Sequence, residues 1–169
     1  MESHPDFDNA IALMGEQMKS LQREFGYVLS GRRHIEHTVN FPNHPEETAS
    51  IRKGIGNLIE GSLVVYLFAM WEAHVPEDVN EWLSAGELEE LNSLRHVRDS
   101  VAHKYKGGRA KFPQRRRAFE AKMPFAGIVW DNGEDTIDLS SSSVAMYCYQ
   151  VMEKLNKMLV VRLYKNQKP

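Results

Sequence analysis

The chain has a single cysteine, Cys148, among its 169 residues. One thiol excludes disulfide-stapled folds and Cys-rich zinc sites, and it is typical of a reducing compartment. A strong excess of charge is also missing, since the formal net charge is −2 and charged residues make up 26 % of the chain. Wholly basic and disordered proteins are therefore excluded, and we expect a globular protein of the cytoplasm.

Long apolar runs and common catalytic motifs are missing too. The longest run, residues 63–71, falls short of the roughly 20 residues that a membrane span needs, and the first ten residues do not resemble a signal peptide. Gly-rich phosphate loops, nucleophile elbows and dinucleotide fingerprints do not occur, so kinase, hydrolase and dehydrogenase classes lack support. His34, His37 and His44 have no further ligands at a convincing spacing, so we expect loop histidines and neither a metal nor a cofactor.

Apolar residues spaced by three and four predict four long helices, over residues 6–30, 47–75, 87–106 and 144–164. Residues 31–47 are expected to form a loop, and a short helical piece is expected near residues 79–83. The second helix is apolar on nearly every face in its later half. Such a helix is either central to a bundle or shared with a partner subunit.

A basic, proline-bounded segment and an alternating stretch around Asn132-Gly133 separate the third and fourth helices. The Asn-Gly pair is a strong signal for a two-stranded hairpin. We therefore predict one domain, residues 1–169, that is all-α: an up-and-down bundle of four long helices, with a basic loop and small β-hairpin inserted at residues 109–139.

Residues 94–105 read "LRHVRDSVAHKY" and place Arg98 near the middle of an apolar helical arc. The position predicts a buried arginine, which needs an anionic partner. Glu72, Asp99 and an anion from outside the protein are the alternatives. His103 follows in the last helical turn, where unpaired carbonyls favour an imidazolium. On spacing alone, a paired bundle arginine and a surface histidine are the ordinary explanation.

This stretch resembles the signature of the HEPN superfamily (higher eukaryotes and prokaryotes nucleotide-binding), in which Arg is followed after four to six residues by His. "LVVYLFAMWEAHV" at residues 63–75 is similar to the apolar helix of bacterial HEPN proteins. The resemblance implies a metal-independent endoribonuclease, a toxin or phage-defence effector, with Arg98 and His103 as its catalytic pair. It also implies a homodimer whose subunits share the active groove.

Three residues have supporting roles under this interpretation. Asp99 fills the polar place after the arginine, and Glu72 either orients Arg98 or is its salt-bridge partner. Tyr105 matches the tyrosine that a partner nucleotidyltransferase, acting as antitoxin, adenylates in some HEPN toxins, although packing is its ordinary role.

Positive charge follows the motif closely. Seven basic residues lie within residues 104–117 and are candidates for contacts to the RNA backbone: Lys104, Lys106, Arg109, Lys111, Arg115, Arg116 and Arg117. A solvated loop is an equally good explanation for any one of them. The alternative function is an inactive HEPN-like module that binds RNA, nucleotide or a partner protein.

Overall fold

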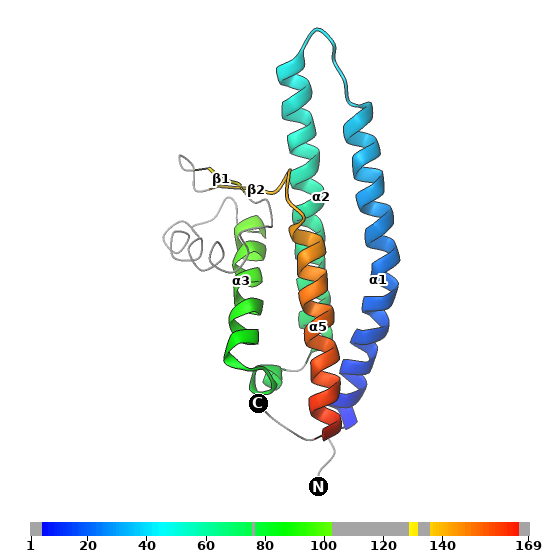
Figure 1. Ribbon diagram of the computed structural model, residues 1–169, viewed down its shortest axis with the longest axis vertical. Coiled ribbons are helices and arrows are strands. Elements are labelled where there is room, and N and C mark those ends of the chain that lie inside the picture. Colours follow the sequence, from blue (N-terminus) through cyan, green and yellow to red (C-terminus); the bar gives the residue numbers. More distant parts are fainter. Residues whose placement is uncertain (1–4, 76, 103–128, 132–135, 166–169) are drawn as a thin grey trace.

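The computed structural model of the protein describes residues 5–75, 77–102, 129–131 and 136–165. Four helices pack against one another, so the predicted all-α bundle is confirmed (Figure 1). The elements in chain order are α1 (Pro5–Thr38), α2 (Pro45–His74), a short 3-10 helix (Glu77–Trp82), α3 (Ala85–Ala102), strands β1 (Val129–Asp131) and β2 (Thr136–Asp138), and α5 (Val144–Lys165).

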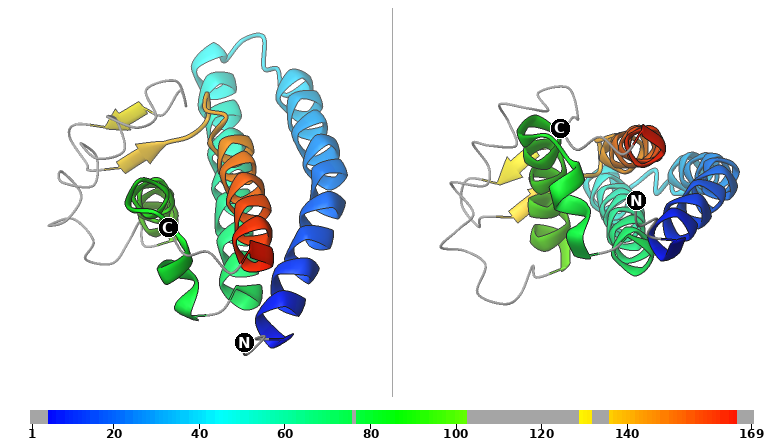
Figure 2. Two further views of the ribbon diagram at one scale, coloured as in Figure 1. Left: turned by 60° about the horizontal axis from the view of Figure 1, so that its bottom comes forward. Right: turned by 90° about the horizontal axis from the view of Figure 1, so that it is seen from below.

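Helix α2 is the centre of the bundle and packs against α1, α3 and α5 (Figure 2). Phe68 and Trp71 project from it into the core and are 0 % and 1 % exposed. An aromatic pair joins α1 to α5, with the ring centroids of Phe25 and Tyr149 5.8 Å apart. By length and composition α2 could also cross a membrane, but core helices of soluble proteins meet the same test, and 44 % of its apolar window is buried.

The connection between α1 and α2 is shorter than predicted. The expected loop at residues 31–47 is wrong for residues 31–38 and 45–47, because α1 continues to Thr38 and α2 begins at Pro45. Arg32 stabilises this extension by bonding Glu36 one turn later and Glu60 on α2. Local composition could not show the second contact, since 28 residues separate its partners. Helix α2 then begins with proline, whose fixed backbone angle suits the first helical position.

The two short strands pair antiparallel, with Val129 opposite Asp138. The predicted Asn132-Gly133 turn between them lies outside the described residues and stays a prediction, as does the extent of the 109–139 insertion. Strand β2 is anchored to α2 because Asp138 bonds Asn57 and Lys53. Burial alone would raise the pKa of Asp138, but hydrogen bonds from Ser140, Lys53 and Asn57 lower it to about 2.

A buried ion pair joins three of the helices. The Glu60 carboxylate, 2 % exposed, accepts hydrogen bonds from Arg32 Nη1 at 2.6 Å and from the Ala145 backbone N–H at 2.9 Å. Arg32 also donates to the Ser140 carbonyl. Burial raises the pKa of Glu60, and the bonds from Ala145 and Arg32 counteract part of that rise. Glu60 therefore caps the first turn of α5, where unpaired N–H groups favour an anion.

Replacing Glu60 by alanine should lower the free energy of unfolding by about 3–5 kcal/mol, because it removes the buried partner of Arg32, which keeps only Glu36, and the acceptor of the Ala145 N–H. Urea denaturation of Glu60→Ala beside wild type measures this loss. Glu36→Ala is the matched control, since it removes only the half-exposed partner of Arg32 and should cost less than about 1 kcal/mol. Equal losses for the two variants would contradict the role of Glu60.

A second ion pair holds the start of α3 against the end of α5. Arg162 donates to both carboxylate oxygens of Glu87, at 2.6 and 3.0 Å, and to the Trp82 carbonyl. The hydrogen bond from Arg162, with further help from the Ser84 N–H, lowers the pKa of Glu87 to about 2. The folded state therefore releases the Glu87 proton more readily than the unfolded chain does.

Stability from this pair should be present above the ordinary carboxyl pKa and should decline as pH falls from about 5 towards 2, since the unfolded chain takes up the proton first. Denaturant titrations at several pH values measure this. Glu87→Gln should show a shallower loss over the same window, and an unchanged slope in this variant would refute the prediction.

Candidate functional site at the α2–α3 edge

Helices α2 and α3 approach closely where α3 ends. A side-chain carbon added to Gly61 would lie 2.8 Å from Val101 Cγ1, so any larger residue would force Val101 to shift. Leu94 and Val97 of α3 are fully buried in the same interface. The contact fixes the last turns of α3 beside the C-terminal half of α2, and Arg98 projects there.

Arg98 lies in a ring of contacts from both helices. Its Nη2 is 3.0 Å from Glu72 Oε1 and its Nη1 is 3.3 Å from Oε2, so the carboxylate of α2 meets the guanidinium edge with both oxygens. Its Nε is 2.9 Å from Asp99 Oδ1. The guanidinium carbon stands 5.3 Å from the ring centroid of Phe68, within cation–π range.

Arg98 is only partly buried, although its Nε atom is fully buried. Its side chain is 25 % exposed and that of Glu72 is 43 % exposed. The apolar arc of α3 is narrower than its sequence indicates, because Leu94 and Val97 fill the interface and leave Arg98 at its rim. Both carboxylates considered from sequence are engaged, which leaves the arginine with internal partners at an open edge of the protein.

This arrangement allows Arg98 to bind an anion that presents two oxygens side by side. A guanidinium recognises carboxylate and phosphate with the same pair of parallel donors, and the Phe68 face restricts its orientation. Glu72 therefore occupies the position that a phosphate would take. Because Glu72 is half exposed, its exchange for an outside anion does not require opening the core.

The structure brings together three of the predicted site residues, Arg98, Asp99 and Glu72, and sequence reasoning did not identify Phe68 as a fourth member. Phe68 falls four residues before Glu72 on α2, a spacing that puts both on one helix face and could have indicated it. The other predicted site residues lie outside the described residues: His103, Lys104, Tyr105, Lys106, Arg109, Lys111, Arg115, Arg116 and Arg117. The relation of Arg98 to His103 stays a prediction.

The histidines near the α1–α2 connection are placed differently from the expectation. His34 and His37 belong to the last turns of α1 rather than to a loop, and His44 directly precedes α2. Among the described residues, no three His, Cys, Asp or Glu side chains are grouped so that they could hold a metal ion.

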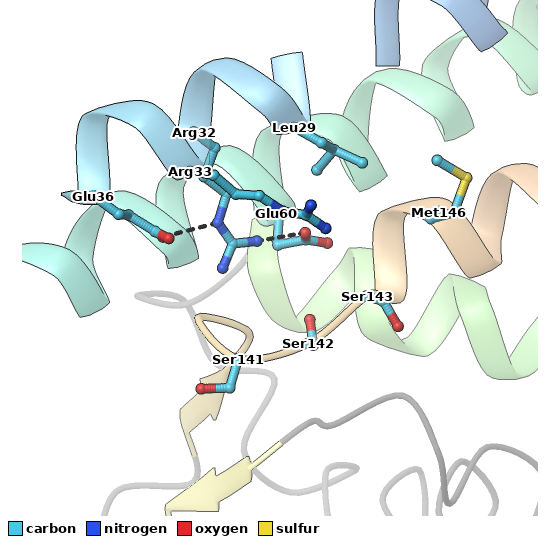
Figure 3. Close-up of a pocket in the computed structure, with 9 residues that line it drawn as sticks. All are labelled: Leu29, Arg32, Arg33, Glu36, Glu60, Ser141, Ser142, Ser143 and Met146. Atoms are coloured by element: carbon cyan, nitrogen blue, oxygen red, sulfur yellow. Dashed lines mark hydrogen bonds and ion pairs between the residues drawn. The ribbon is translucent and has the colours of Figure 1, made fainter. Parts of the chain in front are cut away.

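A separate cavity of about 330 Å³ lies between α1 and the start of α5 (Figure 3). Its lining combines apolar, hydroxyl and paired charged side chains: Leu29, Arg32, Arg33, Glu36, Glu60, Ser141, Ser142, Ser143 and Met146. Arg32 is committed to Glu60 and Glu36 within it. Sequence reasoning did not find this cavity, because its walls come from three segments far apart in the chain.

Comparisons with known proteins identify no relatives. No protein-family model matches the chain, and neither a curated protein nor a solved structure matches it.

Removing the charge of Glu72 should hardly change stability, because exposed ion pairs contribute less than about 1 kcal/mol. We expect Glu72→Gln and Arg98→Ala to unfold at nearly the wild-type urea concentration. Glu60→Ala, measured alongside, provides the comparison with a buried pair. A loss for Glu72→Gln as large as that for Glu60→Ala would show that the Arg98 pair serves the fold.

Proposed function

We propose that the protein is a metal-independent endoribonuclease of the HEPN type. The observation that carries this proposal is the forked Arg98 guanidinium, oriented by Phe68 and held by a half-exposed carboxylate at an open edge. It stands in the stretch of sequence that resembles the HEPN signature.

The proposed reaction begins with attack of the RNA 2′-hydroxyl on the adjacent phosphate. Arg98 stabilises the negative charge that develops on the phosphate oxygens, after they displace Glu72 from its donors. His103 moves protons between the 2′-hydroxyl and the leaving 5′-oxygen. The P–O5′ bond breaks, leaving a 2′,3′-cyclic phosphate and a 5′-hydroxyl end. DNA lacks the attacking hydroxyl and should resist.

The setting of this activity rests on the resemblance and on the basic segment after α3. Residues 104–117 would track the RNA backbone through their positive charges. A toxin or phage-defence effector of the cytoplasm, acting as a homodimer and restrained by an antitoxin or nucleotidyltransferase, is the biological role that we propose.

One observation favours the alternative function, an inactive HEPN-like module that binds RNA, nucleotide or a partner protein. Glu72 already accepts hydrogen bonds from Nη1 and Nη2 of Arg98, and Asp99 forms an ion pair with its Nε. If they are not displaced, the arginine cannot reach a phosphate, and only binding by other residues remains.

The test is incubation of the purified protein with RNA in excess chelator, reading strand scission and the cyclic phosphate ends. Arg98→Ala and His103→Ala should each lower the cleavage rate at least about a hundredfold, the scale of losing charge stabilisation or proton transfer. Arg95→Ala, three residues earlier on α3 and bonded to Asn92, is the matched control and should cleave like wild type.

Two results would oppose the proposal. Cleavage that persists in Arg98→Ala and His103→Ala would eliminate the catalytic pair. Absence of cleavage by every form, with retained RNA binding, would favour the inactive module. A 2′-deoxy substitution at the cut site separates true 2′-hydroxyl attack from other hydrolysis, since only the former is abolished.

A further inference from the structure

One side of α2 is turned away from α5 (Figure 2). By helical spacing, a stripe of residues without charge runs along this side. At about 100° per residue its members share an arc of roughly 100°. We call these residues the α2 stripe: Ile51, Ile55, Leu58, Ser62, Val65, Tyr66, Ala69 and Ala73. Leu58 is 70 % exposed and Tyr66 is 52 % exposed, so the described part of the chain leaves the stripe largely uncovered.

The charged side chains of α2 do not belong to the stripe. Between residues 51 and 73 each charged side chain is bound by another segment: Arg52 by the Val39 carbonyl, Lys53 by Asp138, Glu60 by Arg32, and Glu72 by Arg98. In a protein with 26 % charged residues, a solvated helix face of this length would ordinarily carry several charges. The stripe therefore has the composition of a covered surface.

Helix α1 extends the apolar surface. Val28 and Ile35 are 41 % and 46 % exposed, and by helical spacing they lie on the flank of α1 away from Gly15, which faces α5. We take about 200 Å² as the total surface of a large apolar residue. With their exposed fractions, Val28 and Ile35 together with Ile51, Leu58 and Tyr66 of the stripe then expose on the order of 500 Å². The smaller stripe residues bring this towards the roughly 800 Å² that each partner buries in a standard interface.

The stripe is complementary to itself. A two-fold axis must pair each residue with a fixed counterpart on the other copy. If two stripes run antiparallel with the axis at Ser62, Ile51 meets Ala73, Ile55 meets Ala69 and Leu58 meets Tyr66. Two large aliphatic residues thus meet alanine, and the smallest contact, serine on serine, lies where the helices must approach most closely.

We propose that a second copy of this chain covers the α2 stripe, with the two α2 helices antiparallel and crossing at Ser62. Glu72 is ten residues from the crossing, so the two Arg98–Glu72 pairs would lie about 30 Å apart along the helices. This surface is therefore distinct from the shared groove that the HEPN resemblance implies, and it exists whether or not the protein cuts RNA.

The first test is the molecular mass in solution at micromolar concentration, by sedimentation or light scattering. Leu58→Glu should have half the molecular mass of wild type and keep its helical circular dichroism, because it removes this interface alone and Leu58 is outside the core. Val160→Glu is the matched control. Val160 is an apolar residue of α5, 46 % exposed, and its replacement should leave the wild-type mass unchanged.

The second test fixes the orientation by disulfide cross-linking. Cys148 is buried, which shields its thiol from oxidants, so single introduced cysteines can be followed. Ser62→Cys should cross-link with itself under oxidation. Ala69→Cys alone should not, but it should cross-link when mixed with Ile55→Cys. Self-linking of both Ser62→Cys and Ala69→Cys would indicate parallel helices and overturn the proposed arrangement.

A monomeric wild type, or a dimer unaffected by Leu58→Glu, would overturn the proposal. Flotation of wild type with liposomes, lost in Leu58→Glu, would also overturn it by assigning the stripe to a lipid surface. The RNA assay is independent of these outcomes, because Leu58→Glu leaves Arg98 and its partners untouched.

Discussion

The fold depends on one buried carboxylate. Glu60 lies at the centre of α2. Without it Arg32 would keep only Glu36 as an anionic partner, and the first turn of α5 would lose its acceptor. Burying a carboxylate is unfavourable unless charge and hydrogen bonds compensate it, and here a guanidinium and a helix N-terminus do so together. The interaction therefore fixes α1, α2 and α5 at one level along the bundle, and the strands and α3 are positioned from α2.

The Arg98–Glu72 pair between α2 and α3 has the opposite character. Arg98 and Glu72 meet at the rim of the α2–α3 interface, with 25 % and 43 % of their side chains exposed. Because solvent weakens their attraction, the pair contributes little to the free energy of unfolding. The same chemical pair thus serves the fold where it is buried and remains exchangeable where it is open. This contrast is the reason why we propose a functional role for Arg98 and not for Arg32.

The sequence of α2 was consistent with two interpretations, because this helix has apolar residues on more than one side. Phe68 and Trp71 lie on the side of α2 that is buried in the core. Leu58 and Tyr66 lie on the exposed side that forms the α2 stripe. A central bundle helix and a helix shared between subunits were both consistent with such a pattern, and the structure supports the first directly. The exposed stripe shows that the two explanations need not exclude one another.

The sequence by itself determined the four helices, because the spacing of apolar residues reports which side of each helix is buried, and the last helix was predicted within one residue of α5. It also identified Glu72 and Asp99 as partners of Arg98. Only the tertiary structure decided that α1 continues to Thr38, that Arg98 lies at a rim, and that Glu60 caps α5. Each of these depends on contacts between residues distant in the chain, which periodicity does not encode.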